Sequence, residues 1–65
     1  MTVNIEGLGK ITASKETLNM LHVSFFEHAE LATNNRKPLQ ALVADERSNA
    51  IFKALDSVGY YDGVE

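Results

Sequence analysis

A chain of 65 residues without a single cysteine has few ways to build a stable domain. Domains rarely have fewer than about 50 residues, so this length allows one core and one domain. A lone core in a chain shorter than about 70 residues seldom contributes more than about 3–5 kcal/mol, and small folds usually recruit disulfides, a metal ion or a partner subunit. Disulfides and thiolate zinc sites need cysteine. We therefore predict a homo-oligomer.

The composition and charge are those of an ordinary globular protein. Hydrophobic residues make up 45% of the chain and charged residues 23%, so the chain has enough apolar side chains to fold. The net charge of -3 opposes loose binding to nucleic acid or to anionic lipid. No apolar run approaches the roughly 20 residues that span a bilayer, and the start of the chain does not resemble a signal peptide. We expect a cytoplasmic protein that binds neither nucleic acid nor membrane.

Alternating apolar and polar residues over positions 2–13 predict a β-hairpin. If the Gly-Leu-Gly segment in its middle forms a three-residue loop, Ile5 pairs with Ile11 and Glu6 with Lys10. A two-stranded ribbon is marginally stable alone in water. We therefore expect the hairpin to pack on helices, or to extend into a larger sheet through another subunit.

A helix is predicted over residues 15–33, with Ser14 as its N-cap and Asn34-Asn35 as its stop signal. At about 100° per residue, a broad apolar face forms with His22 inside it. A thinner apolar stripe lies on the opposite side beside Glu27, and a monomeric surface helix would not need it. The broad face comprises Leu18, Leu21, Phe25, Phe26, Ala29 and Ala32, and the thinner stripe comprises Met20, Val23 and Leu31.

Two apolar faces that are out of phase occupy residues 38–58. On one continuous helix the second face is rotated by roughly 100° from the first, so one straight helix cannot bury both. We predict a break at residues 45–49, where Asp45 or Ser48 caps a new helix that ends at Gly59 as its left-handed C-cap. The first face comprises Leu39, Leu42 and Val43, and the second comprises Ala50, Ile51, Ala54, Leu55 and Val58.

The expected fold is α+β. An N-terminal β-hairpin is followed by two or three α-helices, and the small single-layer sheet packs on the helices and is completed by oligomerisation. Residues 38–44 form either a short helix, which their Ala, Leu and Gln propensities favour, or a buried strand parallel to the hairpin. The last helix covers residues 48–58, and residues 59–65 form a tail.

The sequence contains no pattern of residues that predicts a reaction or a metal site. His22 and His28 are six residues apart, about 240° around a helix, so they cannot hold one metal ion together. Ser24 lies one turn from His28, but nucleophilic catalysis also needs an orienting acid and an oxyanion pocket. The segment 7–10 lacks the third glycine and the following helix of a phosphate-binding loop. We expect no catalytic residue, metal or cofactor.

The predicted function is a non-enzymatic protein–protein interaction module that acts as a homo-oligomer, such as a small inhibitor or adaptor of bacterial or phage type. One of the two adjacent tyrosines is expected to pack on the last helix and the other to face outward. The alternative is a small-ligand or nucleotide-binding protein with an intersubunit pocket that uses His22, Arg36, Lys37 and the two tyrosines. The predicted partner-binding residues are Leu8, Met20, Val23, Leu31, Tyr60 and Tyr61.

Overall fold

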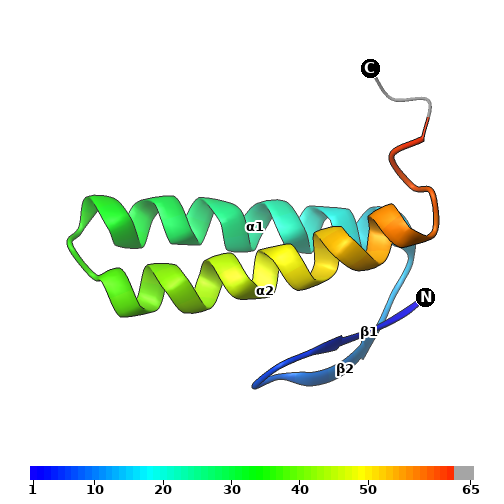
Figure 1. Cartoon of the computed structure of the whole chain (residues 1–65), viewed down its shortest axis with the longest axis horizontal. Helices are drawn as coiled ribbons and strands as arrows, with labels where there is room; N and C mark the ends of the chain where they lie inside the picture. The colour runs from blue at the N-terminus through cyan, green and yellow to red at the C-terminus, as the bar shows by residue number, and fades with distance from the viewer. Residues whose placement is uncertain (63–65) are drawn as a thin grey trace.

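A β-hairpin and two long helices make up the fold. The structure is a computed structural model that describes residues 1–62. The elements are β1 (Thr2–Ile5), β2 (Gly9–Thr12), α1 (Lys15–Asn34) and α2 (Pro38–Ser57). The helices lie side by side and antiparallel, and the hairpin lies along the C-terminal half of α2 (Figure 1). The predicted α+β fold is confirmed, with two helices after the hairpin. Residues 63–65 of the predicted tail lie outside the described part of the chain.

The hairpin forms as predicted, but its predicted register is wrong. Ile5 pairs with Gly9 and Val3 with Ile11, in place of Ile5 with Ile11 and Glu6 with Lys10. The turn is at residues 6–8, because the N–H of Leu8 donates to the carbonyl of Ile5 (3.0 Å) around Gly7, whose φ is 86°. A type II turn requires this left-handed conformation at its third residue. Since the shift is two residues, each side chain keeps its predicted face.

The buried core is small and lies where the hairpin meets both helices. Residues 1–62 bury apolar side chains from β1, α1 and α2, and partly buried residues, among them Ile11, Leu21 and Phe25, pack around them. Neither helix in this part of the chain has the length and apolar content needed to cross a bilayer. The central cluster comprises Val3, Ile5, Leu18, Ile51 and Leu55.

α1 begins and ends at the predicted signals. The Ser14 hydroxyl accepts a hydrogen bond from the N–H of Thr17 (3.1 Å), which is the predicted N-cap. After the C-cap Asn35, Arg36 adopts a left-handed φ of 57°. The N–H groups of Arg36 and Lys37 then donate to carbonyls of the last helical turn at 3.1 and 2.8 Å, as in a Schellman motif. Arginine here occupies a position where glycine is usual.

α2 is one continuous helix, so the predicted break at residues 45–49 is wrong, and so is the alternative strand at 38–44. Its buried residues are spaced by three or four, and this single stripe passes straight through the expected break. Ser48, expected as a cap, belongs to the stripe and is 1% exposed. The first apolar face is left uncovered, since Leu39 is 77% exposed. The stripe comprises Ala44, Ser48, Ile51 and Leu55.

The end of α2 confirms the predicted role of Gly59. Its φ is 77°, and its N–H donates to the carbonyl of Asp56 (3.0 Å). The N–H of Tyr60 donates to the carbonyl of Leu55 (3.1 Å), which completes a second Schellman motif. Val58, expected in the buried face, is exposed at the C-cap.

Candidate protein-binding groove

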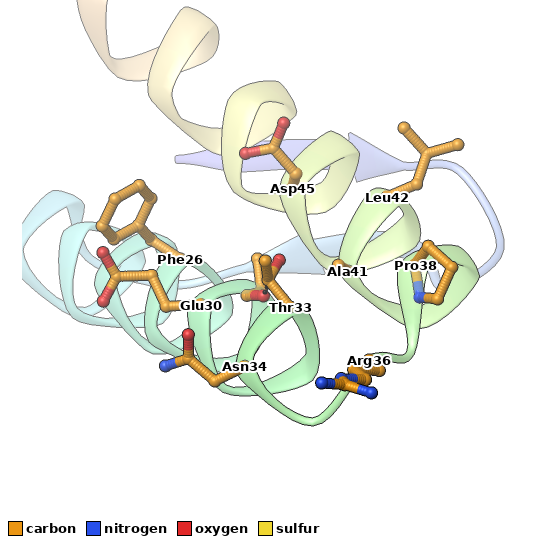
Figure 2. A pocket seen from close by; sticks show the side chains of 10 residues that line it. Phe26, Glu30, Thr33, Asn34, Arg36, Pro38, Ala41, Leu42 and Asp45 are labelled. Carbon is orange, nitrogen blue, oxygen red and sulfur yellow. Dashed lines mark hydrogen bonds between the residues drawn. The ribbon is translucent and has the colours of Figure 1, made fainter.

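An open groove of about 940 Å³ lies between α1 and α2 near the connection that joins them (Figure 2). Phe26 and Leu42 supply its large apolar side chains and are 48% and 55% exposed. Ala29 and Ala41 lie between the walls, where their small size leaves the space open. The lining residues are Phe26, Ala29, Glu30, Thr33 and Asn34 of α1, Arg36 of the connection, and Pro38, Ala41, Leu42 and Asp45 of α2.

Phe26 was expected in the core, and its place in the groove corrects that prediction. It lies about 100° around α1 from Phe25, at the edge of the broad apolar face. The centre of that face is buried at Leu18, Ala29 and Ala32. Phe26 lies to one side of that centre and lines the groove, where it is half-exposed.

Charge is distributed unevenly around the groove. Glu30 on α1 and Asp45 on α2 place one carboxylate on each wall, and Figure 2 shows Asp45 across from Phe26 and Glu30. Arg36 is the single basic residue of the lining and lies at the connection. The groove therefore has an apolar centre and acidic walls. Across residues 1–62, no group of three or more His, Cys, Asp or Glu side chains is arranged to hold a metal ion.

The hairpin leaves the groove open because it packs on the other side of α2. A pocket between the hairpin and α2 is lined by Ile5 and Gly7 on one side and by Val43, Arg47 and Ala50 on the other. These positions are about 200° around the helix from Ala41, Asp45 and Phe52, which face the groove side. The hairpin therefore buries one side of α2 and leaves the opposite side exposed.

A hydrogen-bonded pair, His22 and Ser48, joins the two helices. The Ser48 hydroxyl donates to the backbone carbonyl of His22 (3.0 Å). His22 Nδ1 lies 2.7 Å from the Ser48 hydroxyl oxygen and 3.1 Å from the Ser48 carbonyl oxygen. Since the hydroxyl proton is already donated, Nδ1–H is the donor to these oxygens. A buried serine arranged in this way has no access to a substrate, so the pair is structural.

Sequence reasoning identified His22 as a core histidine but missed Ser48. A serine inside a run of polar residues is typical of a helix cap. The signal that identifies its role is its spacing of four residues from Ala44 and three from Ile51, which places it on the buried stripe.

The predicted contact stripe on α1 is exposed. Met20 is 70% exposed and Leu31 60%, with Val23 also exposed on the same side of the helix. Leu8 is exposed in the hairpin turn. None of these four residues lines the groove. The structure therefore has more than one uncovered apolar surface.

Both tyrosines pack against the fold, so the expectation that one ring faces outward is wrong. The Tyr61 hydroxyl donates to the side-chain carbonyl oxygen of Asn19 (2.7 Å), and its ring stacks on Phe52 with centroids 5.1 Å apart. Tyr60 meets the Tyr61 ring edge-on at the same separation. Both rings are half-buried.

The residues of the alternative ligand site do not come together within one chain. Arg36 and Lys37 lie in the connection before α2, whereas the tyrosines follow its other end. A helix of 20 residues is about 30 Å long, so this distance separates the two groups. His22 lies between the helices and is bonded to Ser48.

A second pocket, of about 530 Å³, lies beside the hairpin on the other side of the helix pair. Ser24, His28, Gln40 and Arg47 supply its polar groups, and its apolar lining includes Leu39. Nε of Arg47 is buried and has no hydrogen-bond partner among residues 1–62.

No protein-family model, curated protein or solved structure matches the chain.

Proposed function

We propose that this chain is a non-enzymatic protein-interaction module that works as a homo-oligomer in the cytoplasm, as a small inhibitor or adaptor of bacterial or phage type. The observation that supports this function is uncovered apolar surface. Among residues 1–62, eight apolar residues are buried, whereas ten large apolar residues are exposed. A fold that exposes more large apolar side chains than it buries gains stability when another protein covers them.

The area of the surface supports the same proposal. The chain exposes 4739 Å², whereas a compact monomer of its mass, 7.2 kDa, exposes about 4,100 Å². The difference is about 600 Å², so the chain exposes more surface than a compact monomer of its mass, as expected of a fold that leaves apolar side chains for a partner to cover.

Self-association is assigned to the stripe formed by Met20, Val23 and Leu31. These residues lie on the side of α1 that points away from α2, so a second copy docked there leaves the groove free. An additional subunit supplies the support that a small core without disulfides lacks.

Light scattering coupled to size exclusion tests this assignment. We expect the wild type to elute as a species heavier than one chain, and the double variant Met20→Asp with Leu31→Asp to be a folded monomer. Asn49→Asp adds a carboxylate on an exposed position of α2 and should leave the oligomer intact. A wild type that stays strictly monomeric at high concentration would contradict self-association.

The second pocket favours a small organic anion as a second candidate function. Arg47 lines this pocket, and its guanidinium carries a positive charge that could pair with a bound oxyanion. A thermal-shift screen with nucleotides and carboxylates tests this candidate, since a ligand at 100 times its Kd adds about 2.7 kcal/mol of stability. The absence of any shift across that panel would eliminate it.

A further inference from the structure

The shape and charge of the groove between α1 and α2 indicate which kind of protein segment it accepts. We infer that it binds an amphipathic helix of another protein, with Lys or Arg residues flanking the apolar stripe of that helix. This inference rests on the proposed function and specifies the class of partner.

The length of the groove matches two turns of helix. Its lining runs from Phe26 to Asn34 on α1 and from Pro38 to Asp45 on α2. At 1.5 Å per residue, each wall is about 11–12 Å long. Apolar side chains at positions i, i+4 and i+7 of a docked helix cover this distance.

The backbone of the walls favours a helix over an extended peptide. From Phe26 to Thr33 and from Ala41 to Asp45, the N–H and C=O groups of the two walls already pair within their own helices and caps. An extended segment laid against this surface would leave its own backbone groups without partners. A helix pairs its backbone groups internally, so it can press an apolar stripe between Phe26 and Leu42 without this cost.

The charge of the walls favours a basic partner over a second copy. Glu30 and Asp45 stand on opposite walls, and the whole chain carries a net charge of -3. Two copies docked groove to groove would bring carboxylates of like charge together. A helix with Lys or Arg beside its apolar stripe places opposite charges there, at the rim, where such pairs contribute modestly to affinity and strongly to selectivity.

The test uses two helical peptides of about 15 residues, cross-linked so that they stay helical at this marginal length. Both carry Leu at i, i+4 and i+7, one with flanking Lys and one with flanking Glu. We expect the Lys peptide to bind the full chain about three- to tenfold more tightly, measured by fluorescence anisotropy. Amide shift changes in NMR spectra should fall within residues 26–45.

Three variants determine where the peptide binds. Leu42→Asp should weaken binding about tenfold or more, and because Leu42 is already exposed this change leaves the core intact. Glu30→Lys with Asp45→Lys should reverse the preference toward the Glu peptide. Glu16→Lys, a charge-reversal control at the far end of α1, should preserve it.

Failure of this inference differs from failure of the proposed function. The inference is wrong if neither peptide binds at about 1 mM, if Leu42→Asp binds as wild type does, or if the shifts map to Met20 and Val23. It is also wrong if Leu42→Asp converts an oligomer to a monomer, because a second copy then occupies the groove. If neither peptide binds, the proposal that copies associate through the α1 stripe still stands.

Discussion

At the scale of single residues, the pair of His22 and Ser48 fixes how the two helices face each other. Replacing Ser48 by Ala removes the hydroxyl that donates to the His22 carbonyl and accepts from Nδ1, and leaves the carbonyl buried without that partner. We expect a loss of about 1–2 kcal/mol in the free energy of unfolding, measured by urea denaturation. Ser57→Ala, which removes an exposed hydroxyl bonded to its own helix, should change it by less than about 0.5 kcal/mol. Equal losses would contradict this role.

Tyr61 should make stability depend on pH in the alkaline range. Burial raises the pKa of the Tyr61 phenol above its ordinary 10.0, and Tyr60 and Asp56 raise it further by repulsion. A raised pKa means that the folded state holds the proton more tightly than the unfolded state does. The stabilisation is complete below pH 10 and is lost as pH rises through the folded-state pKa.

Urea denaturation between pH 8 and pH 12 measures this effect. The wild type should lose stability above pH 10, and Tyr61→Phe should show a smaller loss over the same range, although it is less stable at pH 8 without the bond to Asn19. Wild-type and variant curves that run parallel from pH 8 to pH 12 would show that Tyr61 is not the group responsible.

At the scale of elements, Arg36 marks a helix end that its residue type does not favour. A non-glycine residue in the left-handed conformation costs roughly 1–2 kcal/mol. Arg36→Gly should therefore raise the free energy of unfolding by about 0.5–1 kcal/mol, once the greater freedom of glycine in the unfolded chain is subtracted. Lys37→Gly changes a neighbour with a negative φ and should give no gain. A stability that falls in Arg36→Gly would contradict the capping argument.

The continuity of α2 through residues 45–49 can be tested with proline. In a continuous helix Asn49→Pro removes an internal hydrogen bond and costs about 3 kcal/mol or more. If a new helix began after Ser48, position 49 would be its first residue, where proline is well tolerated. Asn49→Ala serves as the control and should raise stability by about 0.5 kcal/mol through helix propensity. Circular dichroism during thermal unfolding measures both.

Signals that depend on a few neighbouring residues predicted their elements correctly. Ser14 and Gly59 cap helices in the structure because capping requires only residues within one turn. The hairpin register was not predictable in this way, since Gly7 and Gly9 fit a loop at residues 6–8, centred on Gly7, as well as the predicted loop at 7–9, centred on Leu8. The local pattern could not decide between two loops one residue apart.

The uncovered face of α2 shows a different limit. Leu39 and Val43 form a helical apolar pattern as clear as that of Ile51 and Leu55. Such a pattern indicates which residues share a face of the helix, but it does not indicate whether another element covers that face. The hairpin is short and lies mostly along the C-terminal half of α2, with its turn near Arg47, so it does not cover Leu39 (Figure 1). For the same reason the groove could not be predicted, whereas the exposed α1 stripe could, because it lies opposite the core face.

At the scale of the whole molecule, the small thickness of the fold explains why so much apolar surface is exposed. The principal extents are 35 × 30 × 16 Å, so most residues lie close to solvent. If copies associate through the α1 stripe, unfolding is coupled to dissociation and the thermal midpoint should rise with protein concentration. Calorimetry over a hundredfold dilution measures this shift, and the Met20→Asp, Leu31→Asp variant should show none. A wild-type midpoint independent of concentration would argue against coupled assembly.

The alanines between α1 and α2 near the connection affect how wide a partner helix the groove can accept. Ala29, Ala32 and Ala44 are buried there, while the side-chain hydrogen bonds between the helices are at His22 and Ser48. A slight spreading of the walls at the alanines would break none of these side-chain hydrogen bonds. The end of the helix pair near the connection can thus adapt to partner helices of different width, while the end on which the hairpin packs keeps its shape.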